Sequence, residues 1–171
     1  MFEIEITQIN ATNDKLEIEI GQKLLLKFSS SYCNELHEYL ANKQLAPKLH
    51  YFDRINGWLM IFMEDLRTQF EYLEDNAFLR PRQFQLLNDA IKDIHKQGWV
   101  HGDLRRPNIL ISKVIDDDHI KLIDFDWSGK VEQVRYPNYM NPSVTWPSGV
   151  ESGKIIKQEH DLYWLQQLRS V

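Results

Sequence analysis

The chain has 171 residues, of which 43% are hydrophobic and 26% charged, and its formal net charge at pH 7 is -5. This length suits one substantial core, divided into two lobes around a cleft, and is too short for two independent large domains. The composition is that of a soluble globular protein, and the negative net charge argues against general nucleic-acid binding.

Cysteine usage and the distribution of apolar residues predict where the protein works. Cys33 is the only cysteine, which excludes an internal disulfide framework and indicates a reducing, cytoplasmic or otherwise intracellular compartment. The first residues alternate between apolar and charged side chains, as in a strand rather than an export signal. No apolar run is long enough to span a bilayer. We therefore expect neither a membrane nor a nucleic acid as a partner.

The N-terminal half has the pattern of a sheet with one helix. Alternating apolar residues separated by turn-forming runs predict three antiparallel strands, the first two of which form a β-hairpin. Serines at 29–31 precede apolar residues that share one helical stripe, which predicts a helix at about 32–42. Two further strands follow, joined by a turn that contains Gly57. The five expected strands are residues 2–6, 16–20, 23–28, 49–52 and 58–62.

The C-terminal half opens with a change to helical periodicity. From about Pro81, apolar residues recur on one face of a helix that ends at Gly98. Further along the chain, residues 108–114 and 119–123 predict a hairpin about a run of three aspartates. Residues 130–157 have no clean period and predict an irregular segment, which is long for a compact domain. A short amphipathic helix is expected at about 160–168.

Two short motifs, each beside a strand-like apolar run, carry the polar side chains of most interest. They are residues 101–110, HGDLRRPNIL, and residues 123–126, IDFD. The first places the carboxylate of Asp103 and the carboxamide of Asn108 on one loop, and the second brings in Asp124 from a following strand. This set of oxygen atoms can orient a hydroxyl and hold Mg²⁺ on a nucleoside triphosphate. The motifs therefore predict a phosphoryl-transfer centre.

Each of the three side chains has a distinct expected role. Asp103 accepts or orients the proton of the attacking hydroxyl and is the expected base. Asn108 and Asp124 hold Mg²⁺ through hard oxygen ligands, with water completing the coordination. Any one of them alone would be explained as a capping or turn residue. Their order and spacing together favour a functional site.

In these two motifs the chain resembles the protein-kinase-like superfamily. The resemblance also rests on Lys27 in the third expected strand, on the acidic helix that follows, and on the connection MEDL at 63–66. It extends as far as Asp161, which resembles the aspartate that braces the catalytic loop. It implies an α+β, two-lobed fold in a single domain spanning residues 1–171. The N-lobe and hinge, 1–66, would contain about five antiparallel strands and one helix, and the abbreviated C-lobe, 67–171, would be mainly helical.

The resemblance implies that Lys27 binds the α and β phosphates and is held by a carboxylate of the following helix. Glu35 is the first candidate for that carboxylate, and Glu38 is the alternative. Arg105 stands where protein kinases acting on Ser or Thr carry a lysine, and it is expected to offset the charge of the transferred phosphoryl group. Asp126 replaces the usual glycine, which is more similar to small-molecule kinases.

The resemblance also implies an adenine site, at which the backbone of Glu64 and Leu66 faces the base and Met63 lies behind it. The Gly-rich phosphate loop of protein kinases is missing. Residues 10–14, NATND, stand in its place, and their backbone amides can still approach phosphates. The expected cofactors are ATP and Mg²⁺.

Within the superfamily the chain is most similar to compact fungal-type kinase-like domains, some of them attached to Crinkler effectors, which share the HGDLR and DFDW segments. We expect a kinase that moves the γ-phosphoryl group of MgATP to a hydroxyl of a protein, on Ser or Thr, or of a small molecule. The alternative is an inactive pseudokinase that acts as a nucleotide-binding or protein-interaction module. A homo-oligomer or a partner chain would replace the C-lobe helices that dock protein substrates in full kinases.

Overall fold

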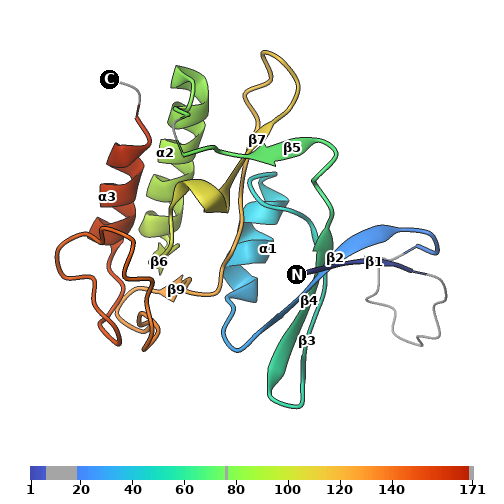
Figure 1. The fold of residues 1–171 in the computed structure, drawn as a ribbon, viewed down its shortest axis with the longest axis horizontal. Coiled ribbons are helices and arrows are strands. Elements are labelled where there is room, and N and C mark those ends of the chain that lie inside the picture. The colour runs from blue at the N-terminus through green and yellow to red at the C-terminus, as the bar shows by residue number, and fades with distance from the viewer. Residues whose placement is uncertain (7–18, 76, 170–171) are drawn as a thin grey trace.

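The computed structural model describes residues 1–6, 19–75 and 77–169. A four-stranded antiparallel sheet, in the order β1-β2-β4-β3, and helix α1 form the N-lobe, while α2, α3 and two small sheets form the C-lobe (Figure 1). The strands are β1 Phe2–Glu5, β2 Lys23–Ser29, β3 Leu49–Ile55, β4 Trp58–Glu64, β5 Phe70–Tyr72, β6 Trp99–Val100, β7 Ile109–Ser112, β8 Ile120–Leu122 and β9 Gly129–Lys130. The helices are α1 Asn34–Asn42, α2 Pro81–Lys96, the 3-10 turn Arg106–Asn108 and α3 Gln158–Gln167. The expected α+β fold is confirmed.

The first strand pairs differently from the expectation. β1 bonds directly to β2, with Ile4 opposite Leu24, a pairing that the expected hairpin of residues 2–6 and 16–20 did not include. The reason is a turn after residue 19, in which the Gly21 N–H donates to the carbonyl oxygen of Ile6 at 2.7 Å. Residues 16–18 of the expected strand lie outside the described part of the chain.

Strand β2 presents both apolar and polar side chains on the face of the N-lobe sheet that carries Lys27. Side chains alternate between the two faces of a strand, so Leu25, Lys27 and Ser29 share one face of β2. On β4 the inner face carries Leu59 and Ile61, which are both buried. The expected strands at 49–52 and 58–62 are confirmed as β3 and β4, and the expected helix at 32–42 as α1.

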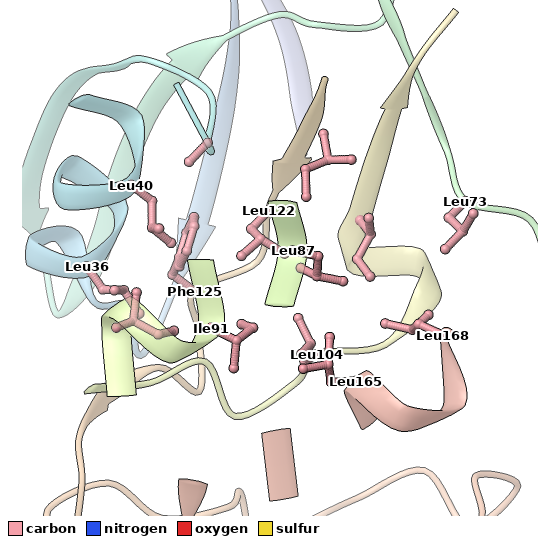
Figure 2. Packing of buried hydrophobic residues seen from close by; sticks show 14 of the residues in the cluster. Leu36, Leu40, Leu73, Leu87, Ile91, Leu104, Leu122, Phe125, Leu165 and Leu168 are labelled. Atoms are coloured by element: carbon pink, nitrogen blue, oxygen red, sulfur yellow. The ribbon is translucent and has the colours of Figure 1, made fainter. Parts of the chain in front are cut away.

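The main hydrophobic core joins both lobes. Leu36 of α1, Leu87 and Ile91 of α2, and Phe125 are each at most 1% exposed and belong to one cluster. Figure 2 shows Leu36 and Leu40 pointing from α1 toward Phe125. Burying a leucine-sized side chain contributes about 2 kcal/mol. The cluster therefore fixes the two motif segments against α1 and α2.

The C-lobe confirms the predicted hairpin and adds pairings that the sequence pattern did not indicate. β7 and β8 pair antiparallel with Ile111 opposite Ile120. β5 extends this sheet, and β6 pairs with β9 through Trp99 and Lys130. The segment from 131 to 157 is irregular, as expected, apart from a bridge between Arg135 and Ile155. No helix in the described ranges combines the length and apolarity that a membrane crossing needs.

Candidate active site

A pocket with a cavity volume of about 220 Å³ lies between the N-lobe sheet and the C-lobe. Its apolar walls come from both sides, with Leu25 on β2, Leu110 on β7 and Ile123 beside the second motif. Such walls suit a flat aromatic ring. The sequence-predicted residues that line it are Lys27, Met63, Glu64, Leu66, Asn108 and Asp124. Six residues that span 97 positions of the chain thus share one cavity.

Lys27 is held by the second motif. Its Nζ lies 2.5 Å from Oδ1 of Asp124 and 2.5 Å from Oδ1 of Asp126, and its side chain is only 14% exposed. The second oxygen of Asp126 accepts a hydrogen bond from Ser29 Oγ at 2.9 Å. Burial raises the pKa of Asp126, although Lys27 acts in the opposite direction. The ammonium group and the two carboxylates therefore form one charged cluster at the pocket.

The expected pair between Lys27 and Glu35 is not formed, and neither is the alternative with Glu38. α1 begins at Asn34, so Glu35 falls in its first turn and is exposed, where its carboxylate accepts from Cys33 Sγ at 3.7 Å. Glu38 is exposed one turn later. The buried face of α1 carries Leu36, His37 and Leu40 instead. The rotation of the helix, which periodicity leaves undetermined at a short helix, decides this outcome.

His37, which the sequence analysis did not single out, occupies the inner side of the pocket. Its Nε2–H donates to the carbonyl oxygen of Pro47 at 2.8 Å, and its Nδ1 accepts from the hydroxyl of Tyr32 at 2.8 Å. Its ring stacks on Phe125 with centroids 4.8 Å apart. Burial lowers the pKa of His37 to about 4, with a further contribution from Lys27. The imidazole is therefore neutral at pH 7 and serves as a packed, hydrogen-bonded wall.

The carboxylate of Asp103 is buried and doubly held. Arg105 donates to both of its oxygens, from Nη2 at 2.8 Å and from Nε. Asn108 Nδ2 donates to Asp103 Oδ2 at 2.9 Å and to the Asp103 carbonyl oxygen at 2.8 Å. Since Asn108 also lines the pocket, Asp103 stands directly behind the pocket wall. The guanidinium group of Arg105 in turn lies 5.0 Å from the ring centroid of Trp146.

The loop that carries Asp103 is braced from α3. Asp161 is fully buried, and its two oxygens accept the backbone N–H groups of His101 and Gly102, each at 2.9 Å. His95 Nε2 adds a third hydrogen bond, also at 2.9 Å. This agrees with the role that the resemblance implies for Asp161. Asp161 of α3 thereby fixes the backbone of the loop that carries Asp103.

Asp124 has a left-handed backbone, with φ of 67°. Aspartate adopts this region more readily than most non-glycine residues, and backbone strain of this kind is frequent at active sites. Its position is fixed by its neighbour Phe125, whose carbonyl oxygen accepts the backbone N–H of Cys33 at 3.0 Å. The side chain of Asp124 is 39% exposed on the cavity side, so it can reach a ligand.

The donor set fits magnesium bound together with phosphates. Asn108 uses its amide nitrogen on Asp103, which leaves its amide oxygen for a ligand in the pocket that it lines. Asp124 supplies a carboxylate at the same pocket. In the described residues, no group of three or more His, Cys, Asp or Glu side chains forms a dedicated metal cage. Mg²⁺ in phosphotransferases needs no such cage, because one or two protein oxygens, phosphates and water complete its octahedron.

The connection after β4 offers one backbone donor at the pocket. The N–H of Glu64 donates to the carbonyl oxygen of Lys48 at 2.9 Å, so it is used within the sheet. The carbonyl oxygen of Leu66 accepts from Gln69 and Phe70. Leu66 N–H makes no hydrogen bond with another described residue, and Leu66 lines the pocket beside Met63. The Leu66 N–H is therefore a backbone donor for the expected adenine contact, and the expectation for Glu64 can concern only its carbonyl oxygen.

Comparison with known proteins decides the family. The model of the phosphotransferase enzyme family matches residues 16–130, which include Lys27 and both motifs. The chain belongs to the phosphotransferase enzyme family. It is also similar to the citron rho-interacting kinase of Rattus norvegicus, 29% identical over 161 residues, and to the dual specificity protein kinase Ttk of Danio rerio, 28% identical over 135 residues. These matches cover 83% and 67% of the chain, but only 8% and 13% of the two relatives.

Solved structures show the same fold. The Cydia pomonella granulovirus kinase PK-1 superposes with a TM-score of 0.63 at 19% identity, over 84% of the present chain and 56% of its own. The BubR1 kinase domain superposes with a TM-score of 0.55 at 20% identity, over 86% and 53%. The chain thus spans little more than half the length of these kinase structures. The protein-kinase-like fold is shown by this similarity.

Proposed function

We propose that the protein is a kinase that moves the γ-phosphoryl group of MgATP to a hydroxyl group. The observation that carries the proposal is the gathering of Lys27, Asn108 and Asp124 around one pocket, with Asp103 hydrogen-bonded to Asn108 at its wall. Membership of the phosphotransferase enzyme family supports the same reaction class. We take ATP and Mg²⁺ as the cofactors, because the donor set fits them.

The proposed roles follow from charge and position. Lys27 binds the phosphates, and Asn108 and Asp124 hold Mg²⁺, which when bound neutralises charge on the phosphates. Asp103 accepts the proton of the acceptor hydroxyl as the new O–P bond forms and the bond to ADP breaks. Arg105, which pairs with Asp103, offsets charge on the moving phosphoryl group. Leu66 binds adenine through its N–H.

The acceptor is a serine or threonine of a protein, or the hydroxyl of a small molecule. Similarity to protein kinases supports the first, and the family model supports a phosphotransferase without restricting its acceptor. We also propose that residues 1–171 form one domain divided near Leu66. The finer resemblance to Crinkler-associated domains is part of this proposal.

One observation favours the alternative, an inactive nucleotide-binding module. Both oxygens of Asp103 already accept hydrogen bonds from Arg105, and one of them also accepts from Asn108. These three hydrogen bonds occupy most of the roughly four lone-pair positions of the carboxylate, so an acceptor hydroxyl has little access to it. A pseudokinase would retain this closed arrangement and bind ATP without transferring phosphate.

ADP release separates the two functions. We expect magnesium-dependent ADP release by the wild-type protein, and a loss of at least about 100-fold in Asp103→Asn and in Asp124→Asn. The matched control is Asp89→Asn, an exposed carboxylate on α2 whose loss should leave the rate unchanged. Normal ADP release from Asp124→Asn would contradict the site assignment. ATP binding that raises the melting temperature without any ADP release would favour the inactive module.

A further inference from the structure

We infer that Asp126, rather than a carboxylate of α1, is the residue that positions Lys27 for the nucleotide phosphates. This rests on the proposed function, since it assigns a role at the same site. Two carboxylates contact Lys27 in the structure, Asp124 and Asp126, and each lies 2.5 Å from Nζ. The acidic residues of α1 that could compete, Glu35 and Glu38, are exposed and make no ion pair with Lys27.

Asp126 is attached to β2 at two consecutive inner-face positions. One oxygen contacts Lys27, and the other accepts from Ser29 Oγ at 2.9 Å. Side chains two residues apart on a strand point to the same side, so Asp126 contacts two neighbouring side chains of β2, those of Lys27 and Ser29. Ser29 is only 7% exposed, which protects this hydrogen bond from water. A carboxylate held at both oxygens has a fixed direction and can fix that of the ammonium group.

The backbone beneath Asp126 is rigid. The preceding residue, Phe125, is 1% exposed, and its carbonyl oxygen accepts hydrogen bonds from the N–H groups of Cys33 at 3.0 Å and Ser128 at 3.3 Å. Its ring stacks on His37. The turn at Phe125 therefore connects Asp126 to the start of α1, and α1 itself need not supply a carboxylate.

Asp124 cannot fill the same role during the reaction. It is the carboxylate proposed to hold Mg²⁺, and an oxygen shared with a dication binds an ammonium group more weakly. Asp126 has Lys27 and Ser29 as its partners and stays available when Asp124 turns to the metal. Lys27 then stays directed at the phosphates. Loss of Asp126 should therefore weaken MgATP binding more than it slows the chemical step.

The test compares KM for MgATP and kcat in three variants. The ion pair with Lys27 is lost in Asp126→Asn, so we expect KM to rise about 10-fold while kcat falls by less than about 3-fold. Glu35→Gln should change KM by less than about 2-fold, because its charge is exposed to solvent. Asp89→Asn, far from the pocket on α2, is the control for carboxylate loss. A large rise in KM for Glu35→Gln with none for Asp126→Asn would overturn the inference.

A double-mutant cycle shows whether Asp126 acts through Lys27. ATP affinity is measured by titration in the wild type, Lys27→Met, Asp126→Asn and the double variant. We expect the Asp126→Asn effect to disappear in the Lys27→Met background. Full additivity would overturn the inference. If Asp126→Asn does not fold, Ser29→Ala replaces it and should weaken ATP binding about 3-fold, by freeing one carboxylate oxygen. An unchanged affinity in Ser29→Ala would then overturn it.

The two proposals fail separately. ATP binding with the expected cycle, but without ADP release, would reject the kinase function and keep the role of Asp126. ADP release by the wild-type protein, together with a wild-type KM in Asp126→Asn, would keep the kinase function and reject the role of Asp126. A wild-type protein that neither binds ATP nor releases ADP would reject both.

Discussion

The buried histidine His37 links the pocket between the lobes to the stability of the fold. His37 is fully buried and stays neutral because no compensating anion is hydrogen-bonded to its ring, whose partners are a carbonyl oxygen and a phenol hydroxyl. Lys27, the nearest charge that acts on it, further disfavours the protonated form. Its pKa of about 4 in the folded protein lies well below its ordinary value of 6.5.

We predict that His37 makes stability depend on pH between about 6.5 and 4. As the pH falls, His37 takes up a proton in the unfolded chain before it does so in the folded protein. The stabilisation that neutral His37 gives the fold is therefore complete above pH 6.5 and is lost as the pH falls to 4. A shift of this size corresponds to roughly 3 kcal/mol. Denaturant unfolding at pH 7 and at pH 4.5 measures it. The free energy of unfolding of His37→Gln should depend less on pH than that of the wild type. An identical pH dependence in the two proteins would contradict the assignment.

Gly102 shows why one position of the first motif tolerates only glycine. Its φ is 85°, and an added Cβ would lie 2.7 Å from the carbonyl oxygen of Trp127. We predict that Gly102→Ala lowers the free energy of unfolding by about 2–4 kcal/mol, through backbone strain and this clash. Gly98 has a similar φ of 74°, but a Cβ added there would have no atom within 4 Å. We therefore expect Gly98→Ala to lower the free energy of unfolding by only about 1 kcal/mol. Equal losses in the two variants would show that the contact with Trp127 is unimportant.

At the scale of elements, α3 acts as a brace for the catalytic loop. We predict that Asp161→Asn costs about 2–4 kcal/mol and also slows turnover, because an amide group cannot accept hydrogen bonds at both of its ends. The backbone N–H of His101 or Gly102 would then lose its partner. Glu159→Gln, an exposed change on the same helix, is the control. Wild-type stability in Asp161→Asn, measured by denaturant unfolding, would argue against the brace.

The elements also show how far a sequence can be interpreted on its own. The helix at Pro81–Lys96, the β7–β8 hairpin and the two motifs were predictable, since each depends on local periodicity or on a short ordered set of residues. The partner of Lys27 was not, because it depends on how α1 is rotated about its axis. An acidic residue in place of the usual glycine, at Asp126, was the one available signal. The pairing of β1 with β2 was missed because alternation identifies strands without giving their neighbours.

At the scale of the whole molecule, the pocket depends on both lobes. The N-lobe supplies Lys27 and Leu25, and the C-lobe supplies Asn108, Leu110 and Asp124. The single core around Phe125 connects α1 with α2, so the walls of the pocket are positioned by the same packing that holds the fold together (Figure 2). The two-lobed α+β architecture was predictable from the order of motifs, and the lack of a clean period indicated the irregular segment. The contact that this segment makes with Arg105 through Trp146 was not predictable.

The most direct measurement follows the γ-phosphate itself. The wild-type protein is incubated with γ-labelled ATP and Mg²⁺ in a host-cell extract, alongside Asp103→Asn. We predict that label leaves ATP for a protein band or a small metabolite only with the wild type, and that chelation of Mg²⁺ abolishes the transfer. Equal transfer by Asp103→Asn, or no transfer by a wild-type protein that binds ATP, would contradict the account.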